Sequence, residues 1–448
     1  MIGGDAGGMS AASQARRRRG PEELEIIAFE RGDYTSYSAC GIPYWVGDVV
    51  DGPDALISRD PDTFRNQFHI DVRLRHEVVA IHPDRHEVTV RNGDGEFPVS
   101  YDHLVYATGA RPIRPDWEGA DAEGVYGVQT LADGAALRAA LANGATRAVV
   151  VGCGYIGVEM AEALMQRGLE VTVVDAAPQP MSTVDPDMGA LVADAMRAVG
   201  IVVRTNETVT GFVTKSGKVT AVVTEHGEIP ADLVVLGMGV RPNTELAAAA
   251  GFPLGVEGGI VTDLRMRVPG FDGVWAAGDC VQTTQLVTGR PTYAPLGTHA
   301  NKQGRVAGIN IGGGYATFPG VIGTAITKVC DVEVARTGLR EKDAAEAGYQ
   351  VVTAKVRSRS RSGYYPGGDH MVVKLIAERR SGRLLGGQIV GGNGAGKRID
   401  TIAAALWNRM TVEEMTSLDL AYAPPFSPVW DPVLITARKA TDALHAAG

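Results

Sequence analysis

The sequence predicts an α/β protein with two nucleotide-binding domains of the same design and a smaller α+β domain at the C-terminal end. Three observations predict this. A glycine-rich turn, a helical stretch and a following acid-terminated strand occur together twice. Near residue 322 the pattern changes to hairpin-like runs such as "MVVKLIAERRSGRLLGGQIVGG", followed by a final helical stretch. With 448 residues the chain is long enough for two or three domains.

Composition excludes several classes of protein. The formal net charge of −9, from 43 basic and 52 acidic residues, argues against a nucleic-acid partner. No segment approaches the roughly 18 uninterrupted apolar residues of a membrane span. The early arginine run is followed by "GPEELEIIAFE" rather than by the apolar region of a secretory signal. We therefore expect a soluble protein of the cytoplasm that binds no membrane.

The cysteines do not form a metal or disulfide pattern. Cys40, Cys153, Cys280 and Cys330 lie far apart, with no C-x-x-C pair among them and no histidine at ligand spacing. Neither a zinc site nor a disulfide framework is predicted. Any thiol chemistry must therefore depend on one cysteine alone.

The segment from Val149 to Asp175 gives the stronger of the two nucleotide signals. A short strand leads into a G-x-G-x-x-G turn at Gly152, Gly154 and Gly157, and a helix and a second strand follow. In a Rossmann-like unit these glycines make the turn, admit the pyrophosphate and let helix and strand pack closely. Asp175 stands where a carboxylate binds the adenosine ribose. Because "DAAPQP" offers no arginine or lysine for a 2′-phosphate, we expect NADH rather than NADPH.

The N-terminal segment "IGGDAGGMSAASQARRRRGPEELEIIAFERGD" has the same order of glycine-rich turn, helix and second strand, with Glu30 at the end of that strand. Aligned on Gly3 and Gly8, the middle glycine position holds Asp5. Only two residues precede Gly3, so the first strand is nearly absent, and we expect the true start of the protein a few residues upstream. Two such units in one chain predict FAD together with NAD(P)H.

Two shorter pieces fit a flavoprotein. "LVYATGARP" is a β-run into Thr108 and Gly109, where the chain can cross between nucleotide domains. "GVWAAGDC" ends a strand with Gly278 and Asp279, where a carboxylate can hold the ribityl chain of FAD. Their order along the chain carries more weight than either piece alone.

This order resembles the pyridine nucleotide–disulfide oxidoreductases over nearly the whole chain. "SYSACGIPYWVGD" resembles their single-cysteine branch of CoA-disulfide reductases, NADH oxidases and NADH peroxidases, and "AYAPPFSPVWDPV" resembles its reductases. The resemblance implies a split FAD domain of residues 1 to about 115 and about 245–320, with an NAD(P)H domain at 116–244 between them. It also implies a dimerisation domain at 322–448, and hence a homodimer.

Cys40 is the candidate redox centre. It follows the acid-terminated strand at the predicted start of a helix, where free N–H groups and the helix dipole would lower its thiol pKa from about 8.5. The resemblance places it beside the flavin ring, so that electrons pass from NADH through FAD to a sulfur species at Cys40. A mixed disulfide there makes the protein a disulfide reductase, whereas a sulfenic acid makes it an NADH oxidase or peroxidase.

Two features favour the reductase. Oxidases and peroxidases of this branch carry a histidine in the first glycine loop, where this chain has Ala6. The reductases place two tyrosines of the partner subunit near the cysteine, and Tyr364 and Tyr422 match them as proton donors to a departing thiolate. Packing at a subunit interface is the alternative role for both. A third reading is a flavoprotein whose cysteine senses redox state without turnover.

The resemblance also implies residues for the substrate. In CoA-disulfide reductases, residues after the first glycine loop and around the cysteine hold the CoA nucleotide, and Gln14, Arg17 and Ser36 match them. Two positions depart from the pattern, because an asparagine is replaced by Ala39 and a lysine by Phe68. The expected substrate is therefore a low-molecular-weight disulfide of the CoA-disulfide type.

Overall fold

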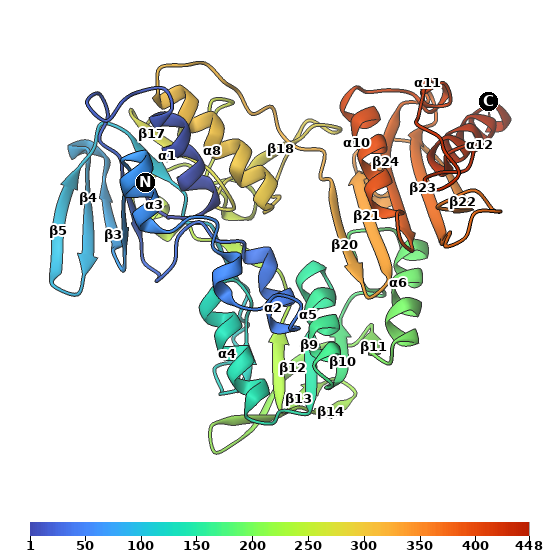
Figure 1. Ribbon diagram of the computed structural model, residues 1–448, viewed down its shortest axis with the longest axis horizontal. Coiled ribbons are helices and arrows are strands. Elements are labelled where there is room, and N and C mark those ends of the chain that lie inside the picture. Colours follow the sequence, from blue (N-terminus) through green and yellow to red (C-terminus); the bar gives the residue numbers. More distant parts are fainter. Residues whose placement is uncertain (448) are drawn as a thin grey trace.

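The computed structural model describes residues 1–447 as three bodies, each with its own β-sheet (Figure 1). The first body combines the N-terminal segment, blue in Figure 1, with a later segment in gold. The second, largely green, lies between these segments in the sequence, and the third is C-terminal, in orange and red. Across the described residues, no helix has the length and apolar character needed to cross a bilayer.

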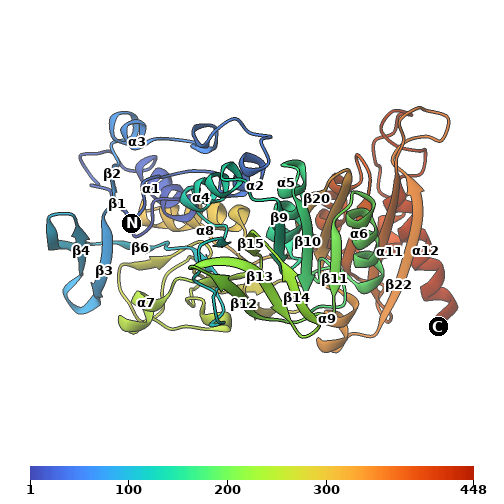
Figure 2. The same ribbon diagram turned by 90° about the horizontal axis from the view of Figure 1, so that it is seen from below.

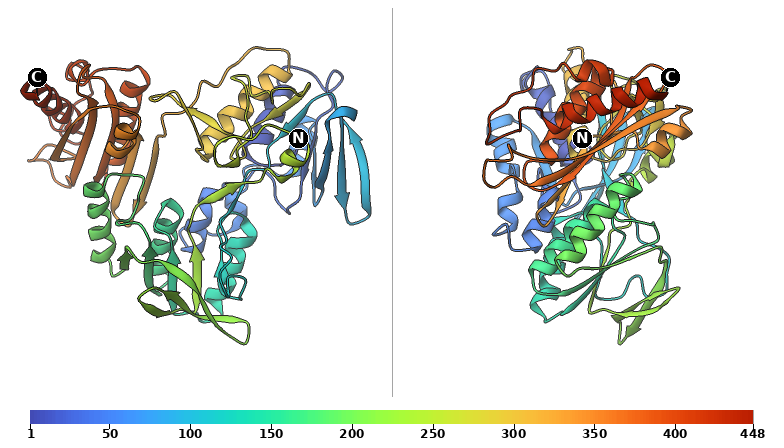
Figure 3. Two further views of the ribbon diagram at one scale, coloured as in Figure 1. Left: turned by 180° about the vertical axis from the view of Figure 1, so that it is seen from behind. Right: turned by 90° about the vertical axis from the view of Figure 1, so that its right-hand side faces the viewer.

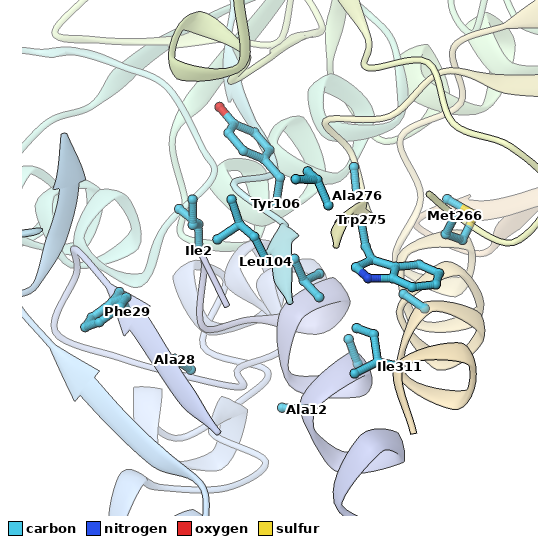
Figure 4. Close-up of a cluster of buried hydrophobic side chains, with 14 of the residues drawn as sticks. Ile2, Ala12, Ala28, Phe29, Leu104, Tyr106, Met266, Trp275, Ala276 and Ile311 are labelled. Carbon is cyan, nitrogen blue, oxygen red and sulfur yellow. The ribbon is translucent and has the colours of Figure 1, made fainter. Parts of the chain in front are cut away.

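The first sheet is parallel, and its central strand is reduced to one residue. Its strands are β2 (Asp71–Leu74), β1 (Ile27–Glu30), β6 (Leu104–Tyr106) and β17 (Val274–Ala276). Ile2 bridges Phe29 of β1 and Tyr106 of β6, and so joins the two strand pairs. The expectation of a nearly absent first strand is confirmed. Figure 4 shows the buried Ile2 side chain beside Leu104 and Tyr106.

Two helices of this body pack unusually closely. They are α1 (Ala6–Arg16) and α8 (Gly297–Ile311). Gly304 and Gly308 of α8 face the backbone of α1: a Cβ on either would lie 2.2 Å from a carbonyl oxygen of that helix. Because no side chain fits there, the two glycines fix α1, and with it the first glycine loop, against the later segment of the same body.

The remaining elements of the first body are short. They are the antiparallel strands β3 (Glu77–His82), β4 (Glu87–Asn92) and β5 (Gly95–Ser100), the hairpin β18 (Thr283–Gln285) and β19 (Arg290–Thr292), and the helices α3 (Pro61–Phe68) and α7 (Glu245–Ala249).

The second body is a five-stranded parallel sheet covered by helices. In spatial order its strands are β11 (Val202–Thr205), β10 (Glu170–Asp175), β9 (Arg147–Val151), β15 (Leu233–Leu236) and β8 (Val125–Tyr126). Its helices are α4 (Leu131–Ala142), α5 (Tyr155–Gln166) and α6 (Pro186–Ala198). An antiparallel sheet of β12 (Val209–Lys215), β13 (Lys218–Thr224) and β14 (Gly227–Pro230) lies beside β15 (Figure 2).

The chain crosses between these two bodies twice, at one place. β7 (Ala110–Pro112) leaves the first body and β16 (Val240–Pro242) returns to it, and the two strands pair with each other. The crossing predicted at "ATGARP" is therefore present.

The segment that carries Cys40 belongs to the first body in sequence but packs on the second. It contains the 3-10 turn η1 (Ala39–Gly41) and the short helix α2 (Ile42–Val46). Ile42 and Trp45 are buried in the hydrophobic core of the second body, among residues of α4 and α5. Arg138 of α4 donates to the Trp45 carbonyl oxygen at 2.6 Å. The cysteine turn is thus fixed at the junction of the two bodies.

The third body is an antiparallel sheet with helices, as the hairpin-like runs predicted. Its strands are β20 (Ala325–Val329), β21 (Val332–Gly338), β24 (Leu384–Gly391), β23 (His370–Glu378) and β22 (Val351–Arg359). Its helices are α9 (Glu341–Glu346), α10 (Ile399–Trp407), α11 (Val412–Met415) and α12 (Pro432–Ala447). Figure 3 shows α12 lying across the sheet, where it contacts β22 and β23.

Candidate active site

The first glycine loop lies at the carboxyl end of the first sheet. Gly3 has φ 106°, and a Cβ there would lie 2.2 Å from a backbone oxygen, while a Cβ on Gly8 would lie 2.1 Å from the Gly3 oxygen. Glu30, at the end of β1, accepts hydrogen bonds from the amides of Gly4 at 2.9 Å and Gly32 at 2.7 Å. Its carboxylate is thereby held beside the loop, where a ribose binds in a Rossmann-like unit.

Asp5 occupies the middle position of this loop, and sequence reasoning gave it no role. Burial, and after it the neighbouring carboxylate of Glu30, raises the pKa of its carboxyl to about 7. The backbone amides of Ala6 and Tyr37 hydrogen-bond to Asp5 and oppose this shift. Because Tyr37 lies three residues before Cys40, Asp5 connects the glycine loop to the cysteine segment.

Thr108 and Gly109 lie at the crossing between the bodies. The Thr108 hydroxyl donates to the Asn243 carbonyl oxygen at 2.6 Å, and the Asn243 side chain donates back to the Thr108 oxygen at 2.9 Å. Gly109 has φ 66°, and a Cβ there would meet nothing within 4 Å. Two hydrogen bonds therefore hold the crossing at Thr108, and open space lies beside Gly109.

Asp279 follows β17 after Gly278, whose φ is 92°. Burial raises the pKa of the Asp279 carboxyl to about 6. Within residues 1–447 its carboxylate oxygens have no hydrogen-bond or ion-pair partner, although the Asp279 carbonyl accepts from the Tyr293 hydroxyl at 2.7 Å. A mostly buried carboxylate without a partner is suited to accept from a ligand hydroxyl.

The second glycine loop has the geometry expected of a dinucleotide fingerprint. Gly152 has φ 94°, and a Cβ there would lie 2.6 Å from a carbonyl oxygen. A Cβ on Gly157 would lie 2.0 Å from the Gly152 oxygen, so this glycine sets the approach of α5 to β9. A Cβ on Gly154 would meet no protein atom within 4 Å. The middle glycine thus faces open space, as a position that admits a pyrophosphate must.

Asp175 ends β10 beside this loop. Its carboxylate accepts from the Cys153 amide at 2.6 Å and from the Ala177 amide at 2.8 Å. Asp175 therefore lies at the carboxyl end of β10, adjacent to the glycine turn, as its sequence position predicted.

The expectation of a lowered thiol pKa at Cys40 is wrong. Cys40 lies in a 3-10 turn, and the helix after it has only five residues, which leaves little dipole. Cys40 is exposed in the single chain. Neighbouring groups still partly shield its sulfur from water, which raises the pKa of the thiol, and the carboxylates of Glu159 and Asp279 raise it further. The charges that face the sulfur are negative, and the sequence alone did not reveal this.

Glu159 is the functional candidate that sequence reasoning missed. It lies on α5, its Oε1 accepts from the Thr327 hydroxyl at 2.7 Å, and burial raises the pKa of its carboxyl. The available signal was an acidic residue two positions after Gly157 in the otherwise apolar "YIGVEMAEALM". Glu159 brings a titratable group of the second body, tied to the third, toward the cysteine.

A pocket of about 380 Å³ brings the predicted substrate residues together. Gln14, Arg17 and Ser36 all line it, although Ser36 comes from the cysteine segment and the other two from α1 and its end. Arg59 and Arg305 line it as well. No sequence pattern singles out these two arginines, because they come from elements far apart in the chain.

Tyr364 and Tyr422 lie together on loops of the third body. Tyr364 is 77% exposed and Tyr422 is 47% exposed. A hydrogen bond between their side chains raises the pKa of the Tyr364 phenol. No interaction within residues 1–447 joins either tyrosine to Cys40. Within one chain the predicted donors and the cysteine are therefore separate.

The other cysteines have different surroundings. Cys153 and Cys280 are buried, and Cys330 lies in the turn between β20 and β21 with φ 52°. The described part of the chain contains no cluster of histidine, cysteine and acidic residues that could hold a metal ion.

Comparison with protein families gives two matches. The family described as pyridine nucleotide-disulphide oxidoreductase matches residues 1–304, and its dimerisation domain matches residues 324–432.

Three curated relatives align over almost the whole chain. An NAD(P)H coenzyme A polysulfide/persulfide reductase of Pyrococcus horikoshii is 39% identical and covers 98% of this chain and 97% of its own. An NADH oxidase of Methanocaldococcus jannaschii is 36% identical, with 98% of each chain covered. A coenzyme A disulfide reductase of Staphylococcus haemolyticus is 29% identical, with 99% of each covered.

Solved structures agree with the fold. An NAD-dependent persulfide reductase from A. fulgidus is 42% identical and superposes with a TM-score of 0.97, over 100% of this chain and 83% of that one. An engineered water-forming NADPH oxidase, derived from the NADH oxidase of Lactobacillus brevis, is 27% identical with a TM-score of 0.94, over 100% of this chain and 98% of that one.

Proposed function

Because the chain belongs to the pyridine nucleotide-disulphide oxidoreductase family, we propose that it uses NAD(P)H and FAD to reduce a CoA-type disulfide or persulfide at Cys40. One observation carries this proposal. The cysteine turn lies at the junction of two glycine-loop bodies, and Ser36, four residues before Cys40, lines a pocket with arginines. Relatives named for CoA persulfide and CoA disulfide support the same substrate class.

The residues present fit both cofactors. For FAD, Asp279 offers a mostly buried carboxylate without a protein partner, Glu30 stands beside the first glycine loop, and Gly109 leaves open space. For NAD(P)H, Gly154 leaves open space and Asp175 stands at the adjacent strand end. FAD, when bound, supplies a two-electron relay between the nicotinamide and the cysteine sulfur. We assign it to the body built from residues 1–115 and 245–320, and the nicotinamide cofactor to residues 116–244.

NADH is the preferred donor in this proposal. Asp175 would accept hydrogen bonds from a ribose and would repel a 2′-phosphate, and the six residues after it contain no lysine or arginine. In the engineered NADPH oxidase the substitutions include the removal of an aspartate and the introduction of two arginines. That redesign follows the same electrostatic argument in the opposite direction.

The arginine-lined pocket suits the phosphates of a CoA nucleotide. Arg17, Arg59 and Arg305 supply positive charge, and Gln14 and Ser36 supply hydrogen-bonding groups. The lysine expected at Phe68 is missing, but the Arg59 guanidinium lies 5.3 Å from the centre of the Phe68 ring. Arg59 thus brings a positive charge to the neighbourhood of that position.

The chemistry needs one thiolate and one proton source. Overall, a disulfide, NAD(P)H and a proton give two thiols and NAD(P)⁺. The Cys40 thiolate attacks one sulfur of the disulfide, which breaks the S–S bond, releases the first thiolate and leaves a mixed disulfide on Cys40. The electron pair of the hydride then breaks that bond, which releases the second thiolate and restores the Cys40 thiolate.

The proton donors come from the partner subunit in this proposal. The dimerisation-domain match indicates a homodimer. Tyr364 and Tyr422 are exposed together on that domain, so a second copy can present them to Cys40. A phenol with an ordinary pKa near 10 is protonated at neutral pH and can donate to a departing thiolate of similar basicity. A reducing cytoplasm suits four cysteines that are all unpaired.

A second candidate function is an NADH oxidase or peroxidase that passes electrons through a Cys40 sulfenic acid. The relative named NADH oxidase, at 36% identity, is the observation that favours it. Ala6 in the first glycine loop favours the reductase.

One steady-state comparison tests these proposals. We expect NADH consumption to require CoA disulfide or a CoA persulfide, to be slower with other small disulfides and to be slight with oxygen alone. Cys40→Ser should abolish disulfide turnover and retain FAD, whereas Cys330→Ser, the matched control, should leave turnover unchanged. Full turnover with oxygen alone, without a contribution from disulfides, would favour the oxidase. Flavin reduction by NADH without turnover on any acceptor would favour a redox sensor.

A further inference from the structure

The loop that follows Asp175, residues 176–185, is held on one side by the second glycine loop. The Met181 amide donates to the Cys153 carbonyl oxygen at 2.8 Å, and the Cys153 amide donates to Asp175 at 2.6 Å. Met181 is almost fully buried and has φ 52°, an unfavourable conformation for a residue other than glycine. Contacts from outside the loop must therefore hold this backbone conformation.

On its other side the loop ends against a buried charge cluster of the third body. Lys374 of β23 and Asp185 at the loop's end are each 3% exposed. The Lys374 ammonium lies 3.0 Å from the Asp185 carboxylate, 2.8 Å from Asp187 and 2.5 Å from Glu341. A buried ammonium with these partners fixes the position of each carboxylate, because an unpaired charge cannot stay buried.

Gln388 of β24 completes the hold on Asp185. The Asp185 amide donates to the Gln388 Oε1 at 2.8 Å, and the Gln388 Nε2 donates to the Asp185 carboxylate at 2.7 Å. The Glu341 amide donates to the other carboxylate oxygen at 3.0 Å. Both oxygens and the amide of Asp185 are thus bound by the third body.

Two arginines of the third body hold the middle of the loop. Arg340 donates to the Ser182 carbonyl oxygen, and Arg336 donates to that of Thr183 at 3.3 Å. Figure 1 shows α6, which begins directly after the loop, beside β20 and β21 of the third body. The backbone from Ser182 to Asp185 is therefore shaped by residues that lie at least 150 positions away in the sequence.

We propose that Lys374 and Gln388 are positioning residues for the nicotinamide cofactor, acting through the 176–185 loop. The inference rests on the proposed function in one respect, namely that Asp175 and the second glycine loop hold the adenosine half of NADH. The loop leaves that carboxylate directly and bonds back to the glycine loop at Cys153. If the contacts to Asp185 are lost, the loop no longer holds Asp175 and the second glycine loop in their relative positions. NADH then binds less tightly, while hydride transfer from bound NADH is unchanged.

The test is anaerobic rapid reduction of the FAD-loaded dimer at varied NADH concentration, which separates the Kd for NADH from the limiting rate. Lys374→Met keeps the length of the side chain and removes the charge. We expect its Kd to rise about tenfold, with a limiting rate and FAD content close to the wild type. The control is Lys355→Met, because Lys355 also pairs with Asp187, at 2.7 Å, but from an exposed position. Its Kd should stay within twofold of the wild type.

A Kd for Lys374→Met within threefold of the wild-type value overturns the proposal, as does a loss confined to the limiting rate. If Lys374→Met does not give a folded dimer, Gln388→Leu is measured against the same criteria. The reduction of the flavin by NADH involves no disulfide, so the test stays valid even if the assignment of the disulfide substrate is wrong. If NADH does not reduce the wild-type flavin, the proposed function fails, and calorimetric NADH binding to the same variants decides the inference.

Discussion

Substitution of Gly154, the middle glycine of the second glycine loop, should weaken NADH binding without destabilising the fold. Gly154 has extended backbone geometry, φ −80° and ψ −164°, and a Cβ there meets no protein atom within 4 Å. Gly154→Ala should therefore change the free energy of unfolding by less than about 1 kcal/mol, mostly through the loss of a favourable helix N-cap. In the proposed function, the added methyl group lies where the pyrophosphate of NADH approaches the turn.

The expected loss of NADH affinity follows from the hydrogen bonds at that position. A Cβ needs about 3.4 Å to a neighbouring heavy atom, so a phosphate bound at this turn would be displaced from its amides. Losing one hydrogen bond to a charged group costs about 1.5–3 kcal/mol. At about 1.4 kcal/mol per tenfold change, the Kd for NADH should rise roughly 10- to 150-fold.

Gly152→Ala should show the opposite pattern. Its φ of 94° and a Cβ 2.6 Å from the Gly237 oxygen make the substitution a folding defect. The left-handed conformation costs about 1–2 kcal/mol and the overpacking about 1–3 kcal/mol. Gly93→Ala, at a glycine with open surroundings on the β4–β5 turn, is the control.

The assay pairs anaerobic flavin reduction with denaturant unfolding of each variant. The expected result is weak NADH binding with normal stability for Gly154→Ala, and low stability for Gly152→Ala. A Kd for Gly154→Ala within twofold of the wild type would refute the assignment of this turn to the pyrophosphate.

Three further predictions concern charge. Glu159→Gln should lower the pKa of the Cys40 thiol, because Glu159 raises it, and the pH dependence of Cys40 alkylation should shift toward lower pH; an unchanged profile would contradict this. Asp175→Ala combined with Ala176→Arg should raise the NADPH-to-NADH ratio of kcat/KM at least about tenfold, and an unaltered ratio would show that Asp175 does not select the cofactor. Arg147, 2.6 Å from Asp232, holds the pKa of that carboxyl well below its usual range. The stability this gives is present above about pH 4, the unfolded-state pKa, and is lost as the pH falls toward the folded pKa. Urea unfolding of Asp232→Asn should therefore show a deficit at pH 7 that disappears in acid, and a deficit independent of pH would contradict the ion-pair argument.

The sequence predicted the parts of the fold that local pattern controls. The glycines at Gly152 and Gly157 need positive φ or close packing, and a strand ending in Asp175 has a fixed place relative to them. The change to hairpin-like runs near residue 322 likewise reports a local periodicity. Each of these features depends on residues close together in the chain.

The electrostatic surroundings of Cys40 could not be predicted in this way. Its thiol pKa depends on Glu159 and Asp279, which are more than 100 residues away. Local reasoning considered only the following helix, and that helix has five residues. Arg59 and Arg305 were missed for the same reason, since the pocket that collects them is assembled from separate elements.

The packing of α2 on the second body has a consequence for engineering this protein. A chimera that exchanged only residues 116–244 for those of a homologue would leave Ile42 and Trp45 facing a foreign surface. The host's Arg138, which donates to the Trp45 carbonyl oxygen, would also be lost. A transplantable module therefore has to include the cysteine segment, residues 36–58, together with the middle of the chain. The unit of exchange is defined by buried contacts rather than by the order of residues.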